Sequence, residues 1–292
     1  MKRLILIILM FLLFLPIGCN NPHEGFKDDD RLKVVTSFYI MYDFTYKIAK
    51  DKVQIINLVD SSSDAHDFEF TSKDIILLEN ADILFYNGLG FEPWIDDIKE
   101  SLTNKNLKMV NTSEKITPLE GDPHSWLSVI NAISQIEVIK DTLIKYDEDN
   151  KDFYNENFNS VLNTLNNLHE DYVTTISSFT KKDIVVSHEA FGYLCHEYGL
   201  NQIGIYDIYN SDEPDIKRIT EIIDFINENK ITTIFYEPNI NKEKVEFIAN
   251  QTKTNIEILN PIEGLTKKEI KDNEDYISIM QKNLIALEGA LK

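Results

Sequence analysis

Short β-branched apolar segments alternate with longer amphipathic segments from residue 33 onward, and this alternation occurs in two sets. The first set predicts strands at Lys33–Phe38, Val53–Val59, Ile83–Tyr86 and Leu107–Val110, and helices near 40–50, 74–80 and 93–103. The second predicts strands near Ile184–Val186, Gln202–Tyr206, Thr232–Tyr236 and Ile256–Leu259, and helices near 190–198, 215–229, 242–251 and 275–290. Strands that alternate with helices indicate an α/β fold of two lobes, each with a mainly parallel sheet flanked by helices.

Between the two sets lies a segment without glycine or proline, Lys151 to Phe179, whose apolar residues recur at helical spacing. We expect one long helix here, which at 1.5 Å per residue would span about 40 Å. A helix of this length would join the lobes rigidly. Binding is therefore expected to involve small adjustments of the lobes rather than wide hinge closure.

The N-terminus has the features of a secretory signal. Lys2 and Arg3 precede an apolar run, Leu4–Leu15, and the Gly18-Cys19 pair resembles the lipobox of bacterial lipoproteins. The alternative is a secretory signal whose cysteine is incidental. The expected organisation is a signal peptide at 1–19, a flexible tether at 20–31, an N-terminal lobe at 32–145, a linker helix at 146–180 and a C-terminal lobe at 181–292.

The composition limits the kinds of molecule that the protein is expected to bind. The 292 residues carry 29 Lys+Arg against 49 Asp+Glu, a formal net charge of -20, which opposes binding to nucleic acid or to anionic lipid. Cys195 is the one cysteine besides Cys19. If Cys19 carries lipid, neither a disulfide within the chain nor a cysteine-ligated metal site is expected.

Three of the six histidines follow predicted strands rather than lying inside predicted helices. They are His66 in a polar loop, His124 after Pro123, and His188 directly after an apolar strand. Neutral imidazole is a common zinc ligand, and ligands of open α/β sheets gather at the carboxyl ends of strands. The three could therefore face one crevice. No pair has the i, i+4 spacing of a helical metal motif, so an ordinary core or surface role stays open for each.

Six segments resemble signature segments of the zinc- and manganese-binding solute-binding proteins of ABC importers, in the same order and over nearly the whole mature chain. They are Gly88–Trp94, Asp122–Leu127, Ser187–Tyr193, Phe235–Pro238, Asn260–Thr266 and Asp275–Met280. The resemblance implies two lobes joined by a long helix, with metal at their interface. It also implies that His66 and His124 are ligands from the N-terminal lobe, and that His188 and Glu263 are ligands from the C-terminal lobe. Without it, Glu263 would be read as a solvated carboxylate.

The ligand set implied by the resemblance favours zinc over manganese. Manganese carriers of this type tend to have a carboxylate where this chain has His188, and three imidazoles with one carboxylate suit tetrahedral zinc. Glu189 would supply oxygen only if the register slipped by one residue. Many zinc carriers have a histidine-rich insertion before the second histidine, but residues 111–121 contain no histidine. Scavenging of metal by that route is not expected.

The expected function is therefore capture of Zn²⁺ outside the cytoplasm and its delivery to an ABC permease, by a monomer anchored to the membrane through Cys19. Three alternatives remain: a manganese carrier of the same family, a surface adhesin in which metal is structural, and a zinc hydrolase. A hydrolase needs an open coordination position for water, which Glu263 would fill as a fourth ligand. No Ser/His/Asp set, phosphate loop or His-Glu-x-x-His helix supports an enzyme.

Overall fold

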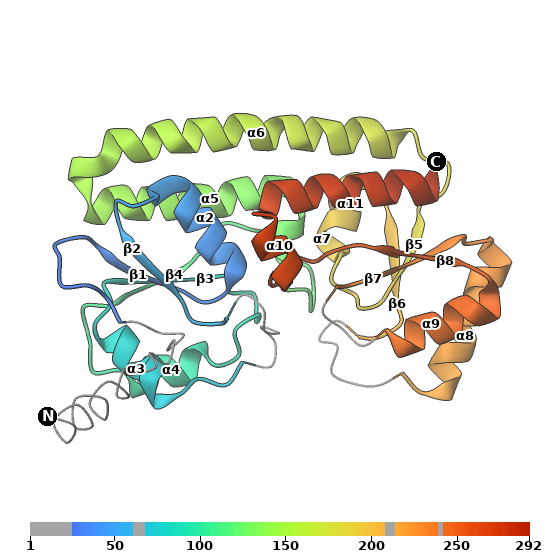
Figure 1. Cartoon of the computed structure of the whole chain (residues 1–292), viewed down its shortest axis with the longest axis horizontal. Helices are drawn as coiled ribbons and strands as arrows, with labels where there is room; N and C mark the ends of the chain where they lie inside the picture. The colour runs from blue at the N-terminus through green and yellow to red at the C-terminus, as the bar shows by residue number, and fades with distance from the viewer. Residues whose placement is uncertain (1–24, 61–67, 208–213, 239–241) are drawn as a thin grey trace, which may run out of the picture.

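The computed structural model describes residues 25–60, 68–207, 214–238 and 242–292. Two lobes lie side by side under one long helix, as Figure 1 shows. The N-lobe contains β1 (Lys33–Thr36), α2 (Tyr39–Ala49), β2 (Gln54–Asn57), α3 (Ser72–Glu79), β3 (Ile83–Tyr86), α4 (Ile95–Ser101) and β4 (Lys108–Asn111). Next come η1 (Ser125–Leu127), α5 (Val129–Tyr146), η2 (Glu148–Asn150) and α6 (Lys151–Ser177). The C-lobe contains β5 (Asp183–Val186), α7 (Gly192–Tyr198), β6 (Asn201–Gly204), α8 (Ile216–Asn229), β7 (Thr233–Tyr236), α9 (Glu243–Thr252), β8 (Asn255–Ile258), α10 (Lys267–Lys271) and α11 (Tyr276–Leu291).

The two sheets have the same strand order. The N-lobe sheet runs β2-β1-β3-β4 and the C-lobe sheet runs β6-β5-β7-β8. All neighbouring strands in these sheets are parallel, which confirms the predicted fold class. The strand order reverses between β1 and β3 in one lobe and between β5 and β7 in the other. Ligands of open α/β sheets bind at the carboxyl ends of strands at such reversals.

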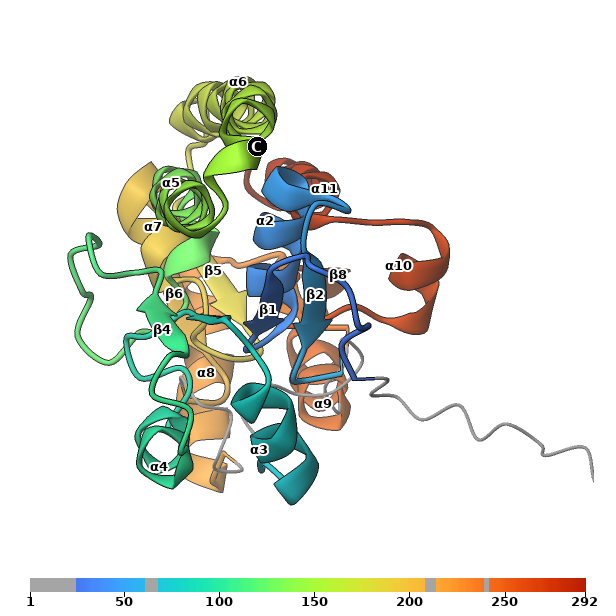
Figure 2. The ribbon, with the colours of Figure 1, turned by 90° about the vertical axis from the view of Figure 1, so that its left-hand side faces the viewer.

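The central strands of each sheet are buried on both faces, and their successive side chains enter the cores on opposite sides. In β1, Val34 belongs to the core that runs under the long helix, whereas Val35 packs into a separate core with α3 and α4. In β7, Phe235 joins the common core and Ile234 packs against α8 and α9. Figure 2 shows these layers end-on, with α5, α6 and α11 above the sheets and α3, α4, α8 and α9 below them. The common core therefore joins the lobes.

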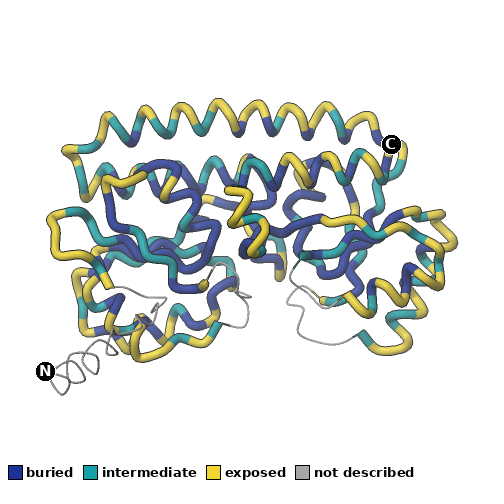
Figure 3. Tube along the Cα trace, viewed as in Figure 1, coloured by how far each residue is buried: buried dark blue, intermediate teal, exposed yellow. Residues whose placement is uncertain are grey.

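Helix α6 confirms the predicted joining helix. It extends over 27 residues and lies above both lobes (Figure 1). Its buried positions follow helical spacing, from Tyr154 through Leu165, Leu168 and Tyr172 to Ile176. Figure 3 shows that its outer side is largely exposed. The lobes are thus connected by a stiff element that is packed along its length.

Helix α5 is the largest element that the sequence analysis did not predict. Ser128 caps it by accepting a hydrogen bond from the backbone of Asn131, and its buried face includes Ile136, Ile139 and Leu143. These residues have helical spacing, so the pattern was present in the sequence. The expected linker at 146–180 consequently begins with the end of α5 and the short η2 turn, and the long helix starts at Lys151.

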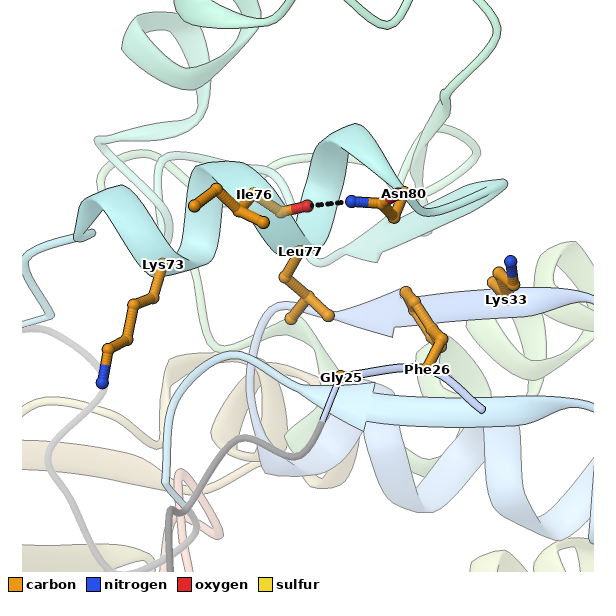
Figure 4. Close-up of a pocket in the computed structure, with 7 residues that line it drawn as sticks. All are labelled: Gly25, Phe26, Lys33, Lys73, Ile76, Leu77 and Asn80. Atoms are coloured by element: carbon orange, nitrogen blue, oxygen red, sulfur yellow. Dashed lines mark hydrogen bonds between the residues drawn. The ribbon is translucent and has the colours of Figure 1, made fainter. Parts of the chain in front are cut away.

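The expected tether at 20–31 contacts the N-lobe where the structure describes it, from residue 25, although most of its side chains are exposed. The backbone of Lys27 exchanges two hydrogen bonds with the side chain of Gln54, at 2.6 and 3.0 Å. Phe26 packs on the core beneath the N-lobe sheet, and Figure 4 shows it lining a pocket with Leu77 of α3. This part of the segment is therefore attached to the lobe because Phe26 buries apolar surface there. Cys19 and the signal segment lie outside the described residues, and among the described helices none is long and apolar enough to span a bilayer.

Candidate metal centre

His124 enters the interface from the N-lobe. It follows Pro123 and precedes η1, and its side chain is fully buried. Asp122 Oδ1 accepts hydrogen bonds from both the backbone amide and Nδ1 of His124, each 2.8 Å long. Asn87, just after β3, donates to the carbonyl of Pro123 at 2.8 Å. These contacts fix the ring so that Nε2 faces the C-lobe.

His188 enters from the C-lobe, two residues after β5, and only 1 % of its side chain is exposed. Glu237 directly follows β7, and its Oε1 lies 2.8 Å from both His188 Nδ1 and the hydroxyl of Ser187. The carboxylate thus holds the ring through Nδ1, as Asp122 does for His124. A metal-bound histidine usually donates its second ring N–H to a carboxylate in this way, which sets the tautomer and raises the basicity of the ligating nitrogen.

Glu263 brings the two histidines together. Its Oε1 lies 3.1 Å from His124 Nε2 and 3.8 Å from His188 Nε2, and 11 % of its side chain is exposed. The candidate ligand atoms of the three residues all lie within 4.8 Å of one another. Tetrahedral zinc with bonds near 2.0–2.1 Å separates its ligand atoms by about 3.3 Å. The three residues therefore fit zinc with small shifts of their side chains.

Charge around the two imidazoles favours a cation. Burial disfavours the charged form of His124, but the hydrogen bonds to Asp122 and Glu263 outweigh it, and the pKa of His124 lies above 6.5. Burial opposes the charge of His188 too, and Glu237, followed by Glu263, raises its pKa above 6.5. Carboxylates that stabilise an imidazolium also stabilise a metal ion in its place.

A second buried carboxylate supports the site from within the N-lobe. Glu92 accepts hydrogen bonds from Ser37 after β1, from the Asn87 backbone and from the Gly88 backbone, at 2.7, 2.8 and 2.9 Å. Burial is the main cause that raises the pKa of Glu92 to about 7. This network fixes the backbone from which Asn87 reaches Pro123, beside His124. Glu92 therefore helps to position the loop that carries His124, a role that the local sequence does not reveal.

The predicted ligands are therefore brought together in part. His124, His188 and Glu263 converge, whereas His66 lies outside the described residues, so its place at the centre stays a prediction. Asp122 and Glu237 were not predicted as partners of the histidines. Asp122 could have been found from its position two residues before His124. Glu237 is far in sequence from His188, and the pairing of β5 with β7 brings the two together.

Two α/β lobes with a buried histidine and carboxylate centre at their interface define a metal-binding solute-binding protein. The family described as zinc-uptake complex component A, periplasmic, matches residues 34–290, and the chain belongs to this family. The high-affinity zinc uptake system protein ZnuA of Bacillus subtilis (strain 168) is 34 % identical over an alignment 302 residues long, gaps included. The alignment covers 96 % of this chain and 94 % of that protein.

Further relatives match most of this chain in sequence or in structure. The zinc-binding lipoprotein AdcA of Streptococcus pneumoniae (strain ATCC BAA-255 / R6) is 29 % identical over 99 % of this chain, which spans 61 % of AdcA. The Zn(II)-bound ZnuA-like domain of S. pneumoniae AdcA has a TM-score of 0.81 at 30 % identity, covering 89 % of this chain and 99 % of that one. The laminin binding protein Lmb of Streptococcus agalactiae has a TM-score of 0.80 at 29 % identity, covering 89 % and 100 %.

Proposed function

We propose that this chain is the extracytoplasmic zinc-binding component of an ABC importer, which captures one Zn²⁺ between its lobes and delivers it to a permease. The main support for the proposal is that His124, His188 and Glu263 come from different lobes and that their candidate ligand atoms lie within 4.8 Å of one another. We propose His66 as the fourth ligand. Relatives named for zinc uptake and zinc binding support the choice of cargo.

Capture exchanges protons for zinc. Both ring nitrogens of His124 face carboxylates, and without a cation between them this arrangement favours the doubly protonated ring. Zinc displaces the proton on Nε2, while the N–H on Nδ1 stays with Asp122. His188 loses its Nε2 proton in the same way and keeps Nδ1–H on Glu237. The two outer carboxylates therefore need not move when the cargo arrives.

The donor set favours zinc over manganese. Two of the three described candidate ligands are imidazoles, and each is buried and oriented by a carboxylate. Manganese prefers more oxygen ligands than this set supplies. A closed set of four protein ligands would leave no coordination position for an activated water, and the family is one of solute-binding components rather than enzymes. We therefore set aside the hydrolase alternative.

The remaining proposals concern location and organisation. We propose a signal segment at 1–19, lipid attachment at Cys19, and a tether at 20–31 that contacts the N-lobe through Phe26. We propose further that the chain acts as a monomer with lobes at 32–145 and 181–292. The relative AdcA is named a lipoprotein, which supports the anchor.

The proposal predicts zinc-dependent import. Cells that contain the permease but lack this chain are expected to take up radioactive zinc slowly at low zinc concentration, and the parent gene should restore uptake. A gene encoding His188→Ala should not restore it, whereas exposed His196→Ala should. Equal uptake with and without the chain would contradict a role in import. Uptake restored equally by the two variants would contradict the assigned ligand instead.

Surface adhesion is a second candidate function, because the similar protein Lmb is described as bifunctional, with adhesin and metal transporting activity. The two functions are distinguishable in the same cells. Adhesion in which metal is only structural predicts no change in zinc uptake when the gene is removed. Import predicts the loss of uptake described above.

A further inference from the structure

The turn that presents Glu263 has an unfavourable backbone conformation. Ile262, the residue just before Glu263, has a φ of 63° and is fully buried. A β-branched residue at positive φ is a genuine outlier, because its side chain crowds the backbone there. Such conformations persist only where surrounding contacts hold them. The contacts around Ile262 therefore determine where Glu263 lies.

The C-lobe holds one end of this turn. Asn260 Oδ1 accepts a hydrogen bond of 2.7 Å from the backbone amide of Ile262. Asn283 of α11 in turn bonds both the amide and the carbonyl of Asn260, at 2.9 and 2.8 Å. Residue 260 is thus fixed to a helix. These contacts leave the carbonyl of Pro261, in the middle of the turn, to another partner.

That partner belongs to the N-lobe. The indole Nε1 of Trp126 donates to the carbonyl oxygen of Pro261 at 2.7 Å. Trp126 lies in η1, two residues after His124, and is fully buried against Phe38 and Phe91, with ring centroids 5.0 Å away in each case. One residue thus spans the interface from the loop of one candidate ligand to the loop of the other.

Trp126 is itself fixed, and the interface around it has further links. Tyr276 at the start of α11 donates to the carbonyl of Trp126 at 2.7 Å. Lys47 of α2 forms an ion pair of 2.5 Å with Asp275, which caps α11. Lys47 is held in place by a second ion pair of 3.2 Å with Asp43 of its own helix. Neither link involves the indole nitrogen. Removing the indole N–H alone should leave the lobes docked and free only the turn at Pro261.

We propose that Trp126 is a positioning residue that fixes Glu263 at His124 Nε2, through its hydrogen bond to the strained turn before Glu263. The inference rests on the proposed function, in which Glu263 is a metal ligand. It assigns to an N-lobe residue the control of a C-lobe ligand. An order of binding follows. His124 and Glu263 already lie in their binding positions before the metal arrives, and small movements of the other ligands then complete the coordination.

A double-mutant cycle tests the inference. Zinc affinity would be measured by chelator competition on the purified protein, the variants Trp126→Phe and Glu263→Gln, and the double variant. Trp126→Phe keeps one aromatic ring at the site but removes the donor together with part of the buried indole, and we expect about a tenfold loss of affinity, as for other groups that orient ligands. In the Glu263→Gln background the same change should cost less than about threefold, because the coupled ligand is already weakened.

Two further measurements separate positioning from general packing. The visible spectrum of bound Co²⁺ should change in Trp126→Phe toward that of Glu263→Gln, since the same ligand is displaced. Tyr172→Phe is the matched control: it removes another fully buried donor, which bonds the Met280 carbonyl at 2.7 Å, and should leave affinity and spectrum unchanged. If Trp126→Phe does not fold, Ile262→Gly loosens the same turn, because glycine adopts positive φ freely, and should lose affinity with the same dependence on Glu263.

The outcomes are distinguishable. Affinity within twofold of the parent in Trp126→Phe, alongside a large loss in Glu263→Gln, would overturn the positioning role and leave the metal centre intact. Equal losses from Trp126→Phe in both backgrounds would also overturn it, because the tryptophan would then act on the fold as a whole. If Glu263→Gln itself bound zinc like the parent, the proposed ligand set would be wrong.

Discussion

His188→Ala will bind zinc at least about 100-fold more weakly than the parent protein, because loss of a direct ligand should exceed the 10- to 100-fold loss typical of an outer partner. The substitution removes a ligand and also leaves Glu237 buried at the interface without the imidazole that it orients. Glu237 then keeps only the hydrogen bond from the Ser187 hydroxyl, and a buried carboxylate that loses its charge partner is costly, so the local structure is expected to loosen as well. Chelator competition at neutral pH measures the loss directly.

The control for this variant is His196→Ala, since His196 is exposed on the neighbouring helix α7. Its zinc affinity should equal that of the parent. His124→Ala should match His188→Ala, because His124 is equally buried and is held by Asp122 in the same manner. Near-parental zinc binding in His188→Ala would show that the cargo is held elsewhere.

Zinc affinity will fall steeply with acidification, by at least about 250-fold between pH 6.5 and pH 5 from proton competition at His124 and His188 alone. The pKa values of His124 and His188 are both raised from the ordinary histidine value, so protons compete with zinc for these rings from a higher pH than they do for free histidine. Each ring must then lose a proton to bind zinc, which costs about tenfold per pH unit and per histidine. The same raised pKa values stabilise the metal-free fold fully below pH 6.5, and that stabilisation is lost as the pH rises through the folded-state pKa.

Titration of zinc affinity from pH 8 to pH 5, corrected for the protonation of the competing chelator, tests this dependence. Glu237→Gln supplies the contrast, because the amide removes a negative charge that raises the pKa of His188. Its zinc affinity should be lower at neutral pH, and the onset of proton competition should move to lower pH. A change of less than tenfold between pH 6.5 and pH 5 in the parent would contradict the assignment of two histidine ligands.

The sequence predicted the fold through periodicity. Alternating apolar runs located all eight described strands to within a few residues, and the unbroken helical pattern located α6. Helix α5 has an equally regular pattern, with Ile136, Ile139 and Leu143 on one face, so this helix too was predictable from periodicity. The equal strand order of the two sheets was not predictable, because strand neighbours depend on tertiary packing rather than on local pattern.

The residues of the candidate centre were predictable only where the neighbouring sequence indicates a ligand. His124 and His188 stand at strand ends, where βα order places ligands, whereas Glu263 was identified through the family resemblance alone. Glu237 and Trp126 act across distances of 49 and 135 residues in sequence, on His188 and on the carbonyl of Pro261. No periodicity encodes such contacts, so the residues that orient the ligands emerge only from the folded chain.

Equilibrium dialysis of the purified protein against Zn²⁺ and Mn²⁺ together, followed by metal analysis, would show whether the protein is a reversible zinc carrier. We expect one zinc per chain, released by chelators without unfolding and not displaced by a large excess of manganese. Manganese bound in place of zinc would contradict the assigned cargo. Metal that leaves only when the protein unfolds would contradict transport itself and indicate a structural role.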